Sequence, residues 1–327
     1  MATSSTIEST RGPSGASPVP ARSFLNRLRG GDEIAYLITG TAAMSILVLT
    51  ALLVFELYHN SAASRGKFGF SFLFTQTWDP VNDQYGALPF IYGTLVTSAV
   101  ALILGIPLGV GAAIFLAELA PPKISDGLTF LIELLAAVPS VIYGLLGIFV
   151  LVPILKALEP AIRATLGWTP LFSGPFYGVS LFSAGVVMSL MIVPFIISIS
   201  REVILAVPND QREAALALGA TRWESTWDVV IPNAFRGIMG SVFLALARAL
   251  GETMAVTMVV GNDPKIKASL FAPGYSIAAV IANEFTEATG TMYTSALIEL
   301  GLVLFALTVV INGAARILVA AGDRNKI

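Results

Sequence analysis

Long apolar runs, each near the length needed to cross a bilayer, constrain the fold of this 327-residue chain more than any other feature. A helix needs ~20 mostly apolar residues to cross a ~30 Å hydrocarbon core. The candidate spans are 34–58, 90–118, 128–156, 178–200, 236–261 and 294–320. Alternation with a period of two is absent, which favours helices over strands. Because only helices and closed barrels satisfy the backbone in lipid, the sequence predicts an all-α integral membrane protein with about six transmembrane helices.

Composition agrees, since 55% of the residues are hydrophobic and only 12% are charged, against ~25% charged in soluble domains. The chain has no cysteine, which excludes disulfides and thiolate metal sites. Residues 1–30 are rich in Ser, Thr, Pro and Gly, and we expect a disordered cytoplasmic N-terminal tail. They do not resemble a signal peptide, because the apolar run after them is too long and lacks a small-residue cleavage site.

The positive-inside rule sets the orientation. With the N-terminus inside, twelve basic residues lie inside and six outside. The inner set is Arg11, Arg22, Arg27, Arg29, Lys123, Arg201, Arg212, Arg222, Arg236, Arg316, Arg324 and Lys326, and the outer set is Arg65, Lys67, Lys156, Arg163, Lys265 and Lys267. The predicted topology is therefore that of a multi-pass membrane protein with both termini on the inner side.

Several spans contain residues that bend helices or let them approach closely. Prolines occur at positions 107, 139, 153 and 194. Gly105 with Gly109, and Ala247 with Gly251, form small-xxx-small pairs. Ordinary helix packing explains these features, and broken helices that line a pathway explain them too.

Segment 208–235, between the fourth and fifth spans, is too charged to cross a membrane. Asp210 followed by Glu213 predicts a helix N-cap with an acid three residues later. The helix is expected to run to Leu218, where Gly219 ends it with a positive φ.

A second short helix is predicted after that turn. Thr221 and Glu224 have the spacing of a capping box, and Pro232 is expected to end the helix. Ala214, Ala215 and Ala217 leave a smooth surface on the first helix. An amphipathic surface loop and a docking segment for another protein both fit these features.

The spacing within this segment resembles the E-A-A-x3-G-x9-I-x-L-P signature of ABC-importer permeases. Glu213, Ala214 and Ala215 are followed at the required distances by Gly219 and by Val229-Val230-Ile231-Pro232, with a mild departure in the last group. The resemblance implies a type I ABC importer permease fold whose cytoplasmic coupling helix docks on a separate ATPase, with Glu213, Ala214, Ala215, Gly219 and Pro232 as the coupling residues.

The chain lacks a G-x-x-x-x-G-K-[ST] phosphate loop. We therefore expect a permease subunit that is not itself an enzyme and binds no cofactor. ATP and Mg²⁺ are expected to be used by the partner ATPase.

Two charged residues lie in the fifth predicted span, Arg248 and, four positions later, Glu252. A central Arg costs ~2.5–3.5 kcal/mol on insertion scales, so it is expected to face protein or water. At this spacing the two side chains meet on one helix face. They form either an ion pair that fixes packing or an anion site on the substrate pathway, since Arg can hold phosphate through two parallel hydrogen bonds.

The stretch Arg248-Ala-Leu-Gly-Glu252-Thr resembles the R-A-x-G-E-T sequence of phosphate-specific transport (Pst) permeases. Residues 137–144 with 151–153, and residues 281–285, resemble the C-subunit type of that family. The resemblance covers about 34–320 and implies a five-helix permease core at 90–320, with 34–58 as an additional first helix.

The same resemblance implies an ATP-driven importer that moves inorganic phosphate across a prokaryotic cytoplasmic (inner) membrane, which places both termini in the cytoplasm. Its other parts would be a second, related A-type permease subunit, two ATPase subunits and an extracytoplasmic phosphate-binding protein. The alternatives are a permease for another oxyanion, such as sulfate or molybdate, and an ion-coupled secondary transporter.

Overall fold

The structure is a computed structural model that describes residues 32–324. The predicted tail at 1–30 lies outside these residues. The chain divides into one unit that ends at Phe55 and a second that runs from Glu56 to Ile327. Between residues 32 and 324 the chain is mostly helical, and its only β-type pairs are two isolated bridges.

The α-helices are α2 (Asp32–Asn60), α3 (Ala62–Phe68), α4 (Leu88–Ile114), α5 (Pro122–Ala136), α6 (Ser140–Leu146), α7 (Val152–Leu166), α8 (Leu181–Leu205), α9 (Asn209–Ala217), α10 (Arg222–Glu224), α11 (Ile231–Leu250), α12 (Met254–Val259), α13 (Ile277–Glu284) and α14 (Thr291–Arg324). The shorter helical turns are η1 (Gly69–Leu73) and η4 (Pro170–Phe172), which are 3₁₀, and η2 (Phe115–Leu119), η3 (Gly147–Leu151) and η5 (Ser225–Val230), which are π.

Six helical segments of the described chain are long and apolar enough to cross a membrane, which confirms the predicted number. They are Ile34–Asn60, Leu88–Leu119, Ser140–Leu166, Leu181–Leu205, Arg222–Leu250 and Thr291–Ile317. Four of them agree with the predicted spans to within a few residues, and the third and fifth do not.

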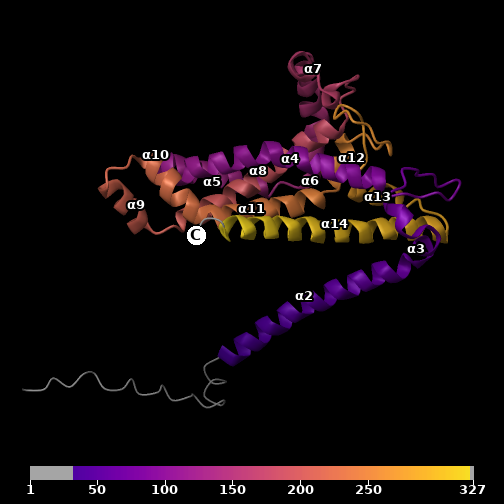
Figure 1. Ribbon diagram of the computed structural model, residues 1–327, viewed down its shortest axis with the longest axis horizontal. Helices are drawn as coiled ribbons and strands as arrows, with labels where there is room; N and C mark the ends of the chain where they lie inside the picture. Colours follow the sequence, from indigo (N-terminus) through magenta and orange to yellow (C-terminus); the bar gives the residue numbers. More distant parts are fainter. Residues whose placement is uncertain (1–31, 325–327) are drawn as a thin grey trace, which may run out of the picture. The chain divides into compact units, whose positions relative to one another are not determined.

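The third predicted span, 128–156, is wrong because a break at 137–139 divides it between α5 and α6. Pro139 has no N–H to continue the helix, and its ring disfavours helical backbone at the preceding residue. Figure 1 shows that α5 runs along the helix bundle, whereas α7 projects away from it. The apolar run therefore changes direction where the sequence predicts one straight helix.

Helices α4, α8 and α11 form the packed centre of the second unit (Figure 1). The glycine pair of α4 allows a close approach to α8. A Cβ at Gly105 would lie 2.9 Å from Ile192, and one at Gly109 would lie 2.7 Å from Ile196. This pair therefore serves helix packing, as small-xxx-small spacing predicts. The other pair does not, since a Cβ at Gly251 would contact only a carbonyl of its own chain turn.

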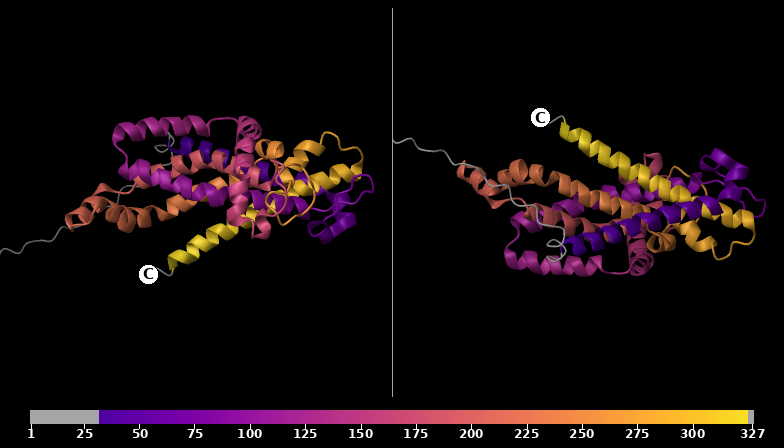
Figure 2. Two further views of the ribbon diagram at one scale, coloured as in Figure 1. Left: turned by 90° about the horizontal axis from the view of Figure 1, so that it is seen from above. Right: turned by 90° about the horizontal axis from the view of Figure 1, so that it is seen from below.

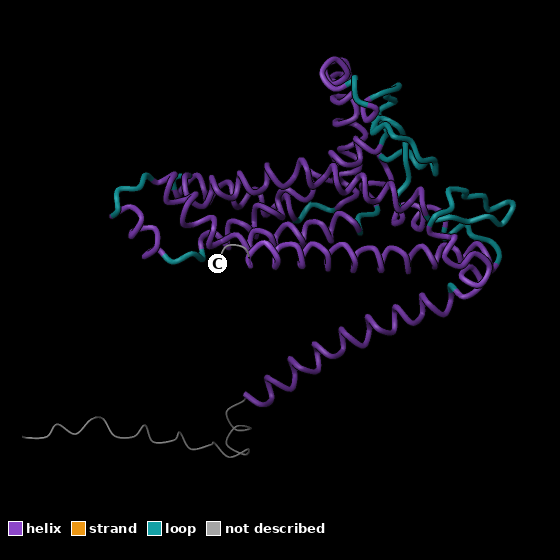
Figure 3. Tube along the Cα trace, in the orientation of Figure 1, coloured by secondary structure: helices purple, strands orange, loops and turns teal. Residues whose placement is uncertain are grey.

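The two ends of the bundle differ. Figure 2 shows α9 and α10 at one end, with α13 and the longer loops at the other. Figure 3 shows most of the loop structure gathered towards the α13 end. At that end α3 packs on α14, where the backbone N–H of Ser64 donates to Oγ of Ser295 over 3.1 Å. The α9 end is compact and helical, and it holds the docking segment predicted from the sequence.

Candidate functional site: a docking groove and a broken span

The first helix of the predicted docking segment is α9. It begins two residues earlier than expected: its N-cap is Pro208, and the prediction of Asp210 as N-cap is wrong. The fixed φ of proline suits a helix entry. Asp210 instead lies in the first turn, where its negative charge interacts favourably with the helix dipole.

The turn after α9 is the one that the sequence predicts. Gly219 has φ +92°, a value that residues with side chains rarely adopt. The N–H of Gly219 donates to Leu216 over 3.0 Å, and the N–H of Ala220 donates to Ala215 over 3.1 Å. These bonds satisfy the last carbonyls of α9 and reverse the chain.

The second helix starts as predicted but does not end at Pro232. Thr221 and Glu224 form the expected capping box. From there the chain continues without interruption through η5 into α11, so the prediction that Pro232 ends this helix is wrong. Pro232 stands in the first turn of α11, where a missing N–H is tolerated. The carbonyl of Val229 accepts a hydrogen bond from Nδ2 of Asn233 over 2.8 Å, beside the proline.

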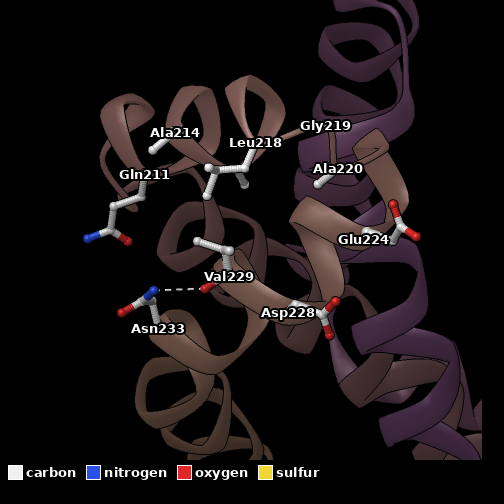
Figure 4. A pocket seen from close by; sticks show the side chains of 10 residues that line it. Gln211, Ala214, Leu218, Gly219, Ala220, Glu224, Asp228, Val229 and Asn233 are labelled. Carbon is white, nitrogen blue, oxygen red and sulfur yellow. Dashed lines mark hydrogen bonds between the residues drawn. The ribbon is translucent and has the colours of Figure 1, made fainter.

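A groove of about 680 Å³ lies between α9 and the helix that follows it. Figure 4 shows Gln211, Ala214 and Leu218 on one wall, with Val229 and Asn233 on the other. The complete lining is Gln211, Ala214, Ala215, Leu218, Gly219, Ala220, Glu224, Asp228, Val229 and Asn233.

The groove combines small apolar side chains with acidic groups. Leu218 is 91% exposed beside the alanines, and Glu224 and Asp228 contribute the negative charge. Next to the groove, Trp223 and Trp227 stack with ring centroids 5.7 Å apart, and both are more than half exposed. Exposed apolar and aromatic groups of this kind are typical of a surface that contacts another protein.

The predicted coupling residues do not share one surface. Ala214, Ala215 and Gly219 line the groove. Glu213 is exposed on α9 outside that lining, and Pro232 lies further along, at the start of α11.

One arginine that the sequence reading did not single out anchors α9 to the bundle. Nη2 of Arg212 lies 2.8 Å from Oε1 of Glu118, and Nε donates to the same carboxylate over 3.2 Å. Nη2 also donates to the carbonyl of Ile204 over 2.8 Å, and Nη1 donates to the carbonyl of Val207. The Arg212 side chain is 16% exposed and that of Glu118 is 12% exposed. Glu118 lies 94 residues earlier in the chain, so no local spacing signals the contact.

The fifth predicted span, 236–261, is interrupted where Arg248 and Glu252 lie. Helix α11 ends at Leu250, Gly251 to Thr253 are not helical, and α12 begins at Met254. The prediction that the two charged side chains share one helix face is therefore wrong, because that geometry needs an unbroken helix. Among the described residues no ion pair joins them. Instead, Oε1 of Glu252 accepts a hydrogen bond from the N–H of Ala255 over 3.2 Å, at the start of α12.

Arg248 lies at the end of α11 with an exposed side chain. Its guanidinium stands 5.9 Å from the ring centre of Phe195, on α8. Tyr143, on α6, is close enough for an electrostatic interaction with it. Non-helical backbone and an arginine inside a span are typical of a cavity or pathway within a transporter.

The α13 end contains a buried aromatic cluster around Glu284, in the stretch 281–285. Nε1 of Trp78 and the hydroxyl of Tyr293 donate to its carboxylate over 2.9 and 2.7 Å. Burial raises the pKa of nearby Tyr275 to about 12. The hydroxyl accepts a hydrogen bond from Nδ2 of Asn283 over 3.0 Å. These contacts hold Glu284 in the fold and leave it little freedom to act as a ligand.

Across residues 32–324, no group of His, Asp or Glu side chains is arranged to hold a metal ion. The candidate site has two features, the groove beside α9 and the break in the helix that follows Arg248.

Helices long and apolar enough to cross a membrane define a multi-pass membrane protein, with a groove beside α9 at one end of the bundle. The chain belongs to the family described as "Binding-protein-dependent transport system inner membrane component", whose pattern it matches over residues 105–321. It is thus a multi-pass protein of the inner membrane, as the apolar helices also indicate.

Relatives of known name are similar along most of the chain. The phosphate transport system permease protein PstC of Mesorhizobium japonicum is 48% identical over 290 residues, which cover 87% of this chain and 89% of the relative. The protein of the same name from Haemophilus influenzae is 44% identical and covers 88% of this chain and 93% of the relative. The PstC 2 protein of Mycobacterium tuberculosis is 37% identical, with 91% and 94% covered.

Solved structures confirm the fold. A chain of a bacterial alginate ABC transporter superposes with a TM-score of 0.58 at 17% identity, and the match covers 88% of this chain and 96% of that one. A chain of the MetNI methionine ABC transporter gives a TM-score of 0.52 at 17% identity, with 71% and 95% covered. The expected ABC importer permease fold is therefore confirmed, whereas at this identity the cargo of those transporters says nothing about the cargo of this chain.

Proposed function

We propose that this chain is the permease subunit of an ATP-driven importer whose cargo is inorganic phosphate. The observation that supports the cargo is the similarity to PstC proteins, at 44–48% identity over most of both chains. Arg248, in the last turn of α11 and beside the break, provides a cation in the membrane part of the fold, through which an anionic cargo has to pass.

The docking groove supports the second part of the proposal, that ATP hydrolysis takes place in a separate subunit. Its walls come from α9 and from the helix that leads directly into α11. A partner seated in the groove would push on α11, and thereby on the break at residues 251–253. The acidic residues Glu224 and Asp228 suit a partner surface with lysine or arginine at this point.

The complete transporter would contain a second, related permease subunit, two ATPase subunits that use ATP and Mg²⁺, and an extracytoplasmic phosphate-binding protein. In this arrangement the α9 end and both termini are cytoplasmic. The chain itself binds no cofactor and performs no catalysis.

Glu252 has a specific role in this proposal. A protonated phosphate oxygen can donate a hydrogen bond to a carboxylate, whereas sulfate has no proton to donate at neutral pH. In the present structure Glu252 holds the start of α12 through Ala255. Movement of the break would release this carboxylate towards the pathway.

The test is uptake by the complete transporter reconstituted in vesicles with its binding protein and ATP. Radiolabelled phosphate is expected to accumulate, and an excess of unlabelled sulfate or molybdate is expected to leave that uptake unchanged. Strong competition by sulfate or molybdate, or uptake of either in place of phosphate, would refute the cargo assignment. It would leave the permease assignment intact.

A further inference from the structure

The structure connects α9 to the bundle by two separate routes. On one route α9 packs against η5, which continues into α11. On the other, the guanidinium of Arg212 contacts Glu118 in η2, at the end of α4, and the carbonyl of Ile204 in the last turn of α8. The first route leads to the break beside Arg248, and the second leads to the glycine-packed pair α4 and α8.

The second route depends on one side chain. The backbone on either side of α9 consists of the short connection at 206–208 and the turn at Gly219. Neither segment is helical, so no continuous helix joins α9 to α8 or to α10. Without the grip of Arg212, α9 could rotate about these points and move α11 while α4 and α8 stayed in place.

The geometry of the contact suits the transmission of a movement. The guanidinium meets the carboxylate through Nε and Nη2 together, a forked contact that fixes orientation as well as distance. Both side chains are mostly buried, so water replaces the contact poorly if one partner is lost. Two further hydrogen bonds, to the carbonyl of Ile204 in α8 and to that of Val207 just after it, remove the remaining freedom of the guanidinium.

We infer that Arg212 and Glu118 are positioning residues that carry the displacement of α9 into α4 and α8, so that these two helices move together with α11 when the ATPase acts. This inference rests on the proposed function, because it assumes that α9 is the docking helix. The inference concerns the interior face of α9, which points into the bundle, and adds no contact with the ATPase itself.

The experiment measures the coupling ratio, defined as phosphate taken up per ATP hydrolysed, in the complete reconstituted transporter. Arg212→Met and Glu118→Gln are expected to keep ATPase subunits bound and hydrolysing while the ratio falls about tenfold, within the range of couplings between two sites. Arg212→Lys keeps the charge but loses the fork, so an intermediate ratio is expected.

The matched control is Arg201→Met. Arg201 also lies near the end of α8 with a side chain only 14% exposed, but its contacts are with Ser125 and Glu202 and do not reach α9. Its variant is expected to keep the wild-type coupling ratio, even if less transporter assembles. A ratio in Arg201→Met as low as that in Arg212→Met would show that any lost buried arginine has this effect, and would overturn the inference.

A distance measurement separates transmission from simple stabilisation. The chain has no cysteine, so cysteines placed at Ala217 on α9 and Lys123 on α5 can carry spin labels without background from this subunit. The start of α5 is held to η2 by the hydrogen bond from Ser125 to Leu116, over 2.8 Å. In the otherwise unaltered transporter, the distribution of distances between the two labels is expected to stay narrow with and without ATP. In Glu118→Gln this distribution is expected to broaden.

The outcomes are decisive in each case. A wild-type coupling ratio in both Arg212→Met and Glu118→Gln overturns the inference. It is also overturned if uptake falls only as much as the amount of assembled transporter falls, while the distribution of label distances stays narrow. If Arg212→Met does not assemble, Glu118→Gln and Arg212→Lys give the same decision. If the unaltered transporter takes up no phosphate, the proposed function fails, whereas the label distances still report on the connection.

Discussion

Gly219 is the residue at which one substitution tests the docking segment most cleanly. Its φ of +92° lies in the left-handed region. A Cβ built there would meet no heavy atom within 4 Å, so a side chain adds conformational strain without a clash. For an ordinary L-residue this strain costs about 1–2 kcal/mol.

That strain translates into a change in docking. At 25 °C, 1–2 kcal/mol corresponds to about a 5- to 30-fold change in an equilibrium constant. If the partner binds only α9 with its native turn, the apparent affinity falls with the fraction of chains that keep the turn. Gly219→Ala is expected to weaken ATPase binding by up to this factor and Gly219→Val to weaken it further, whereas Gly219→Asn is expected to be milder because Asn tolerates this region.

The assay is equilibrium binding of the ATPase subunit to the permease pair in lipid nanodiscs. Gly240→Ala is the matched control, because Gly240 lies inside α11 with ordinary φ and equally open space around a Cβ. Alanine there is expected to be neutral or slightly stabilising. Equal affinities for Gly219→Val and Gly240→Ala would refute the reasoning.

Three further predictions follow. Arg248→Met, Glu252→Met and the double variant are each expected to lose phosphate uptake per assembled transporter, with Arg248→Lys partly active; wild-type uptake by the double variant would rule out a role on the pathway. Reporter fusions at Asn60, Asn209 and Lys326 are expected to report outside, inside and inside, and an outside signal at Asn209 would contradict docking on a cytoplasmic ATPase. Gly93→Ala would bring a Cβ to 2.1 Å from the carbonyl of Tyr275, so the free energy of unfolding is expected to fall by about 1–3 kcal/mol. Thermal unfolding in detergent measures this loss of stability, with Gly111→Ala as the control. Equal melting temperatures for the two variants would contradict the prediction.

The parts of the fold that depend on local chemistry could be predicted from the sequence. The turn at Gly219 and the capping box at Thr221 were correct because each depends on a few neighbouring residues. The number of spans was correct because hydropathy over about 20 residues is a strong signal.

The errors arose where two rules conflict or where distant residues meet. Proline commonly ends a helix, but Pro232 follows the π turn η5 and lies in the first turn of α11, where it is tolerated. The break after Leu250 is hidden because the residues on both sides of it are apolar helix formers. The contact between Arg212 and Glu118 joins residues 94 positions apart, and only the packing of α4, α8 and α9 brings them together.

The most direct test of the central claim is accumulation of phosphate against its gradient in vesicles that contain the assembled transporter. Accumulation is expected only with ATP and the binding protein. It is expected to fail in Ala215→Trp, where a large side chain fills the groove, while the variant still reaches the membrane. Accumulation driven by a proton or sodium gradient without ATP, or undiminished accumulation by Ala215→Trp, would contradict an ATP-driven permease coupled through α9.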